Sequence, residues 1–166
     1  GKILHSIVEE FFNLRPEALP EQHYQQNLMI LVTDMLQKKW KENGAELGKL
    51  GLAHDQLEFY LEESNVMVQM WLHEVIKKIQ KHRESGLSFV QSFEAVRPIQ
   101  IEGFYKSETY NVLGYVDAIF DRNGDVDIVD YKTSKKDEIT PEYQLQLAIY
   151  AMMYAEKHHR KPKRVG

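Results

Sequence analysis

The sequence predicts an α/β domain of the α+β type, with helices first, a meander of strands around a central antiparallel hairpin, and a closing helix. Three observations support this. Apolar residues recur at helical spacing through the first half of the chain. From residue 88 the pattern changes to runs rich in β-branched and aromatic residues, and Pro141 then opens another helical stretch. We therefore expect one domain over 1–166, mainly helical over 1–87, with the sheet and any site over 88–166.

Three helices are expected before the sheet. The first covers 3–12 and ends before Pro16, and the second covers 22–40 and is closed by a glycine-rich turn that starts at Gly44. The third is long. Asp55 is its expected N-cap, and its apolar stripe continues to Arg83, before Gly86.

The second half is expected to contain strands at 89–96 and 99–105, followed by a β-hairpin over 114–132. Asn123-Gly124 lies between two β-rich runs and is the strongest short signal for a hairpin turn. A final helix is expected over 142–157. A strand is expected to begin at Val165, which together with the start at Gly1 indicates a piece of a longer protein.

The hairpin turn fixes which residues meet. If Asn123 and Gly124 form a two-residue turn, Arg122 faces Asp125, and counting outward places Asp117 opposite Asp130. Opposed residues share a face with Cβ atoms roughly 5 Å apart. Lys132, two residues after Asp130, returns to the same face. A four-residue loop would keep this parity, whereas an odd-numbered loop would break it.

Composition limits the functional classes. The chain has no cysteine, so neither a disulfide nor a thiolate metal site forms within it. It has no apolar run of membrane-spanning length and no secretion signal, so we expect a cytoplasmic protein. A net charge of −4 argues against a generally basic surface, so any contact with nucleic acid should be local.

Two acids and a lysine that lie together suit the binding of a divalent cation and reaction at a phosphoryl group. Oxygen ligands, with one imidazole at most, favour Mg²⁺ or Mn²⁺ over Zn²⁺. A lysine beside such an ion can orient water and offset charge on a phosphoryl group. The alternative is a cross-strand salt-bridge cluster on a solvated face. Against that alternative, the strand pair is apolar on both faces, with Ile119 and Ile128 on one and Val116 and Val129 on the other.

Three segments together resemble the PD-(D/E)XK nuclease superfamily: Gly-Tyr-Val-Asp at 114–117, Val-Asp-Tyr-Lys-Thr at 129–133 and Gln-Leu-Ala-Ile-Tyr at 146–150. More narrowly they resemble its RecB-like branch, which includes the RecB and AddB nuclease domains and the RecB-like CRISPR-associated exonucleases. That branch adds a helical histidine, which Gly-Lys-Ile-Leu-His at 1–5 matches.

The resemblance implies a restriction-endonuclease-like α-β-β-β-α-β core. It implies a Mg²⁺ or Mn²⁺ ion with four ligands from the protein, namely His5, Asp117, Asp130 and the backbone carbonyl of Tyr131. It also implies that Lys132 is catalytic and that Gln146 and Tyr150 line the site. An iron–sulfur cluster, which many members of the branch carry, would require cysteines outside this stretch.

Other charged residues are weaker candidates. Glu94 and Glu102 are possible auxiliary acids, with Glu94 better placed at a strand end, although both are also explained as surface charges. Phosphate contacts are expected from basic residues on either side of the last helix. These are Lys135, Lys136, Lys157, Arg160, Lys161, Lys163 and Arg164.

The sequence thus predicts a metal-dependent DNA nuclease, acting as an exonuclease on single strands or ends, in repair, recombination or CRISPR adaptation. A helicase domain or subunit is a possible partner. The alternative is a catalytically inactive domain of the same fold that binds DNA or scaffolds a helicase. The presence of Asp117, Asp130 and Lys132 together favours the enzyme.

Overall fold

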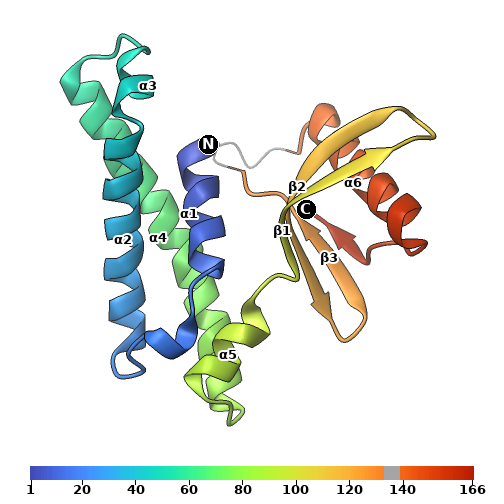
Figure 1. Cartoon of the computed structure of the whole chain (residues 1–166), viewed down its shortest axis with the longest axis horizontal. Coiled ribbons are helices and arrows are strands. Elements are labelled where there is room, and N and C mark those ends of the chain that lie inside the picture. The colour runs from blue at the N-terminus through green and yellow to red at the C-terminus, as the bar shows by residue number, and fades with distance from the viewer. Residues whose placement is uncertain (133–138) are drawn as a thin grey trace. The chain divides into compact units, whose positions relative to one another are not determined.

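The computed structural model describes residues 1–132 and 139–166, and the chain forms two compact units, Gly1–Val96 and Arg97–Gly166. Figure 1 traces the elements of both. The described helices include none that is long and apolar enough to cross a membrane.

The first unit is helical, as expected. Its three long helices are α1 (Lys2–Phe12), α2 (Tyr24–Glu42) and α4 (His54–Glu84), which confirm the predicted helices to within two residues at each end. Its short elements are η1 (Pro16–Ala18), α3 (Gly44–Gly48) and α5 (Phe89–Val96). An aromatic core joins α1, α4 and α5, in which the Phe11 ring lies 5.2 Å from Trp71 and 5.4 Å from Phe93.

The start of α4 differs from the prediction. Its N-cap is Ala53 and not Asp55, because the Gln56 side chain accepts a hydrogen bond from the Ala53 backbone N–H at 3.0 Å. Asp55 lies in the first turn, where a negative charge interacts favourably with the helix dipole. The expected glycine-rich turn contains the short helix α3.

The strand predicted at 89–96 is wrong, because these residues form α5. A capping box starts this helix. Ser88 Oγ accepts from the Gln91 backbone N–H at 3.2 Å, and Gln91 Oε1 accepts from the Ser88 backbone N–H at 2.9 Å. Phe89, Phe93 and Val96 then follow at helical spacing and are buried.

The second unit contains a four-stranded mixed sheet in the order β1-β2-β3-β4. Its strands are β1 (Gln100–Ser107), β2 (Val112–Arg122), β3 (Asp125–Val129) and β4 (Arg164–Val165). The β2–β3 hairpin confirms the predicted turn, with Arg122 opposite Asp125. Asn123 and Gly124 have φ values of 54° and 95°, as a type I′ turn requires. The strand expected at Val165 is β4, which pairs in parallel with β3.

Helix α6 (Pro141–His158) connects β3 to β4 and packs on one face of the sheet, as Figure 1 shows in red. Thr140 caps it, with its Oγ1 accepting from the Tyr143 backbone N–H at 3.2 Å, and Pro141 occupies the first turn. Tyr150, Met153 and Tyr154 of α6 form a buried cluster with Tyr105 and Val116 of the sheet. Its sheet-facing side therefore presents Tyr150 toward β2 and β3.

Candidate active site

One row of the sheet breaks the regular strand pattern. The pairs Ile101↔Ala118 and Gly103↔Val116 flank it, so Glu102 lies opposite Asp117. Glu102 has a left-handed φ of 48°, which is uncommon for a residue other than glycine, asparagine or aspartate and costs of order 1–3 kcal/mol. A strained residue in the middle of a strand is typical of a functional position.

Side-chain directions confirm the break on both strands. On β1, the Tyr105 hydroxyl donates to Gln100 Oε1 at 2.8 Å, although residues five apart on a regular strand point to opposite faces. On β2, Val116 and Ile119 belong to the same buried cluster, although they are three residues apart. Glu102 and Asp117 lie between these positions, so the break turns both acids out of the regular alternation.

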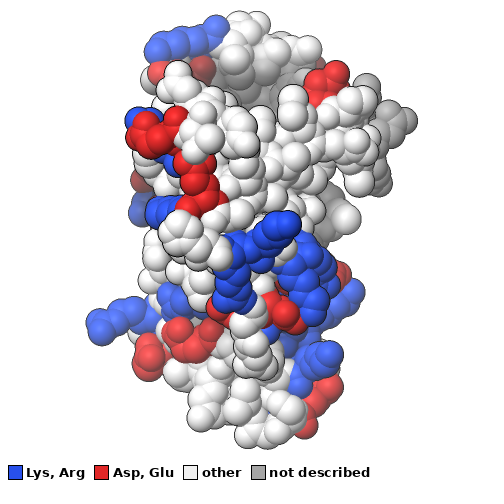
Figure 2. Space-filling view, turned by 90° about the vertical axis from the view of Figure 1, so that its right-hand side faces the viewer, with Lys and Arg blue, Asp and Glu red and all other residues white. Residues whose placement is uncertain are grey.

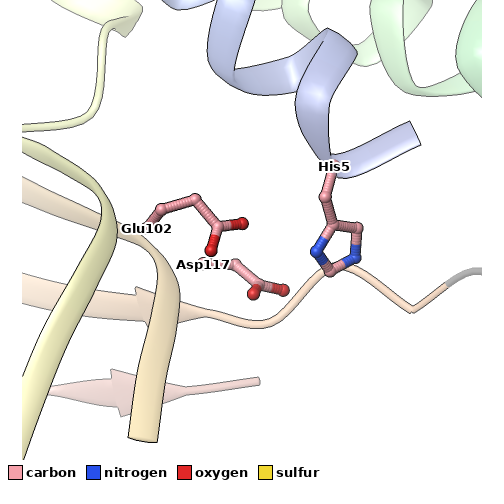
Figure 3. A group of neighbouring side chains, drawn as sticks. All are labelled: His5, Glu102 and Asp117. Atoms are coloured by element: carbon pink, nitrogen blue, oxygen red, sulfur yellow. The ribbon is translucent and has the colours of Figure 1, made fainter. Parts of the chain in front are cut away.

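The two carboxylates of this row converge. Each offers an oxygen, and these oxygens lie within 4.8 Å of one another. Figure 3 shows both side chains pointing into the same space from neighbouring strands. Asp117 is buried and Glu102 is half-buried. Two carboxylates held this close repel each other, and a divalent cation between them would relieve that repulsion.

Asp130 continues the row just after the end of β3. The hairpin register runs from Arg122↔Asp125 to Ala118↔Val129, so Asp130 follows the last pair by one residue. The chain there stays close to β2, because the Tyr131 backbone N–H donates to Asp117 Oδ2 at 2.7 Å. The register therefore agrees with the predicted opposition of Asp117 and Asp130, and it adds Glu102 on the far side of Asp117.

Lys132 lies beside Asp130, as the sequence predicts. Its Nζ is 2.7 Å from Asp130 Oδ2, donates to Gln146 Oε1 at 3.0 Å, and lies 4.4 Å from the centre of the Tyr143 ring. Burial lowers the pKa of Lys132, but the hydrogen bond and charge of Asp130 outweigh it, so the pKa is raised overall. The ammonium group is therefore charged at neutral pH.

Gln146 connects the lysine to the acid and to α6. Its Nε2 donates to the Tyr150 hydroxyl at 2.7 Å and lies 3.4 Å from Asp130 Oδ1. Gln146 and Tyr150 are one turn apart, so α6 presents both to the same spot. Burial raises the pKa of Tyr150, and the charges of Asp130 and Asp117 raise it further against the opposing Gln146 hydrogen bond. The phenol is thus neutral and available as a hydrogen-bond donor.

The donor set fits a hard divalent cation. Asp130 is buried, and its Oδ2 forms an ion pair with the Lys132 ammonium group at 2.7 Å. A buried carboxylate is costly to keep charged unless cations or hydrogen-bond donors compensate its charge. With Glu102 and Asp117 nearby, the oxygen-rich arrangement suits Mg²⁺ or Mn²⁺.

The remaining predicted residues have different outcomes. His5 lies half-buried on α1, in the first unit, and its role as a ligand stays a prediction. The same holds for the Tyr131 carbonyl. Lys135 and Lys136 lie outside the described residues. Arg160 and Lys161 are exposed just after α6. Figure 2 shows Lys and Arg side chains gathered near the middle of the face that it draws, with Asp and Glu side chains among them.

The preference for Glu94 over Glu102 as an auxiliary acid assumed that Glu94 ends a strand, and that placement is wrong. Glu94 is not at a strand end but exposed on α5, whereas Glu102 lies opposite Asp117. The signal that would have found Glu102 is the length of the β1–β2 loop. Ser107 pairs with Val112 across four loop residues, and counting back from that pair leads to Glu102 and Asp117. The sequence offers no equally strong turn motif at this loop.

The comparison with protein families agrees with this geometry. The model of the PD-(D/E)XK nuclease superfamily matches residues 1–166, so the chain belongs to that superfamily. Its four-stranded mixed sheet, with α6 packed on one face, is consistent with a restriction-endonuclease-like fold. No curated protein and no solved structure matches the chain. Membership implies a metal-dependent nuclease, a hydrolase of phosphodiester bonds that binds nucleic acid.

Proposed function

We propose that the protein is a Mg²⁺- or Mn²⁺-dependent deoxyribonuclease of the RecB-like branch. The observation that carries this proposal is the pair of converging carboxylates of Glu102 and Asp117, with Asp130 and Lys132 next to them just after β3. Glu102 and Asp117 offer oxygens within 4.8 Å of each other, and Asp130 follows in the same row with Lys132 at 2.7 Å. A salt-bridge cluster on a solvated face would not bury Asp117 and Asp130.

The metal would be held by Asp117 and Asp130, with Glu102 as a further carboxylate and with His5 and the Tyr131 carbonyl as the ligands that the resemblance implies. When bound, such an ion polarises a phosphoryl oxygen and lowers the pKa of a coordinated water. The burial of Asp117 and Asp130 favours this role, because a dry site strengthens electrostatic interactions.

Lys132 supplies a fixed positive charge. Its ammonium group, held by Asp130 and Gln146, would orient the attacking water and stabilise the charge that develops on the phosphoryl group. Gln146 keeps the lysine in place through Oε1 while its Nε2 donates to Tyr150. Such preorganisation lowers the barrier because the charge needs no rearrangement during the reaction.

The substrate would be DNA, bound through local basic residues because the chain as a whole is negative. Lys163 and Arg164 already pair with Asp125 and Asp127 of β3, so Arg160 and Lys161 are better candidates for phosphate contacts, together with Lys135 and Lys136. We propose cleavage from single strands or ends in repair, recombination or CRISPR adaptation, in the cytoplasm and alongside a helicase.

A nuclease assay tests the proposal. End-labelled single- and double-stranded DNA is incubated with the protein in Mg²⁺, in Mn²⁺ and in EDTA. We expect cleavage only with a divalent ion, and we expect Glu102→Gln to weaken it while the matched exposed Glu94→Gln does not. Metal-independent binding of DNA with no cleavage in either ion would instead support the inactive DNA-binding domain.

A further inference from the structure

A pair of exposed aromatic rings lies on the sheet face opposite α6. Phe104 of β1 and Tyr115 of β2 are cross-strand partners, with ring centroids 5.4 Å apart and planes tilted by 57°. Their neighbours Tyr105 and Gly114 face α6, where a Cβ at Gly114 would lie 3.5 Å from Met153 Cε. Because neighbours on a strand point to opposite faces, the two rings face away from the helix.

Both rings are exposed to solvent. Phe104 is 47% exposed and Tyr115 57% exposed, and the adjacent Leu113 is 66% exposed. A cross-strand aromatic pair adds about 0.5–1.5 kcal/mol to stability, but that gain does not require both rings to stay open to water. Three exposed apolar side chains on one face of a sheet are a candidate binding surface.

The position and charge around the rings indicate the occupant. The Phe104–Tyr115 row is two residues along each strand from the Glu102–Asp117 row, so the rings and the acids lie on neighbouring stretches of β1 and β2. Lys106 is two residues further along the same face of β1. Lys106 forms an ion pair with Glu108 at 2.7 Å, and both side chains are exposed, so a phosphate can compete with that weak pair.

We propose that Phe104 and Tyr115 form a stacking platform for the unpaired bases of single-stranded nucleic acid. The surface combines two aromatic rings with the cation of Lys106, so its ligand must combine flat apolar faces with negatively charged linkers. The ligand must also be long enough to reach Glu102 and Asp117. This inference rests on the proposed function and names how its substrate is held. Stacking tolerates any base, since every base has a π-face. Bases inside a duplex are stacked on each other, so the platform selects single strands.

The test is a binding measurement without catalysis. Fluorescence anisotropy of a labelled oligothymidylate is measured in EDTA with the full chain. Phe104→Leu and Tyr115→Leu keep an apolar side chain and remove the ring, and each should weaken binding about five- to a hundredfold. Tyr115→Phe should bind as wild type does. Phe59→Leu, which removes a 52% exposed ring from α4 in the other unit, is the matched control and should also leave affinity unchanged.

Two further readouts identify stacking. The salt dependence of binding should keep its slope in the leucine variants, because the rings neutralise no phosphate. Wild type should bind an oligonucleotide with abasic positions more weakly than an intact one. On the abasic oligonucleotide the leucine substitutions should lower the affinity little further, because the missing base and the missing ring remove the same stacking contact. The abasic series on wild type alone still tests the proposal if a leucine variant fails to fold.

Unchanged affinity in folded Phe104→Leu and Tyr115→Leu proteins, or equal binding of abasic and intact strands by wild type, overturns the platform. Neither result bears on cleavage, because no divalent ion is present. Failure of the proposed function shows instead as an absence of cleavage in Mg²⁺ or Mn²⁺, with the ring-dependent binding intact.

Discussion

Replacing Lys132 by methionine tests whether the lysine ammonium group takes part in the proposed phosphodiester hydrolysis. Methionine keeps an unbranched stem of similar length and removes the ammonium group. In the structure that group is 2.7 Å from Asp130 and 3.0 Å from Gln146 Oε1, and the side chain is 42% exposed. The substitution therefore removes one charge from a defined position with little change in packing, since nearly half of the side chain is already in water.

The size of the effect follows from that position. Two unit charges about 4 Å apart at the effective dielectric of a protein surface interact by about 4 kcal/mol. Solvent screening of a half-exposed group reduces the part that acts on the transition state to roughly 3 kcal/mol, and each 1.36 kcal/mol is tenfold in rate. We expect kcat to fall by about 10²-fold or more, the scale seen when one preorganised electrostatic group is lost.

Single-turnover cleavage of a labelled oligonucleotide in Mn²⁺ measures this rate, and anisotropy in EDTA measures affinity. DNA affinity should fall far less than the rate, because the lysine acts mainly on charge that develops in the transition state. Lys49→Met is the matched control, since Lys49 is also paired with a carboxylate, Glu46 at 2.6 Å, but lies beside α3 in the first unit. Cleavage by folded Lys132→Met at the rate of wild type or of the control would refute this mechanism.

Three further predictions concern stability and binding. In EDTA, Asp117→Asn should raise the midpoint of thermal unfolding by roughly 2–4 °C, which is the shift for about 1 kcal/mol. The substitution removes the repulsion between Asp117 and Glu102 and keeps an acceptor for the Tyr131 N–H. An unchanged or lowered midpoint would contradict the claim that these two carboxylates repel each other. The Arg164 hydrogen bond lowers the pKa of Asp127 below its usual value against the opposing effect of burial, so the stabilisation is present above about pH 4 and is lost as pH falls through the lowered pKa. Urea unfolding of Arg164→Gln should therefore show a smaller loss of stability over that acidic range than wild type, and identical pH profiles would contradict the assignment. Neutralising Arg160 and Lys161 together should weaken DNA binding and reduce its salt slope by up to about 2, and an unchanged slope would place the phosphate contacts elsewhere.

The hairpin that positions the acids was predictable because its information is local. Asn123 and Gly124 require a turn with positive φ, and the turn sets the register by counting alone. The arrangement of Lys132 beside Asp130, and of Gln146 with Tyr150, follows from the periods of a strand and a helix in the same way.

What the sequence did not predict depends on non-local pairing or on competing local signals. The position of Glu102 opposite Asp117 depends on the pairing of β1 with β2, which is non-local. Its positive φ belongs to a distorted row, and the intrinsic preference of glutamate does not favour that conformation. The 89–96 segment is rich in residues that suit strands, yet the Ser88–Gln91 capping box and the packing of Phe93 on Phe11 favour a helix. Tertiary packing overrides a weak propensity there.

The measurement that tests the central claim most directly is a calorimetric titration of Mn²⁺ into wild type and Asp130→Ala. Wild type should bind one or two ions, and Asp130→Ala should lose at least about tenfold in affinity, because loss of even an outer-shell partner of a metal ligand typically costs about 10–100-fold. Lys132→Met should retain Mn²⁺ affinity, because lysine is not a ligand. Equal Mn²⁺ affinity in wild type and Asp130→Ala would contradict the claim that these acids form the metal site.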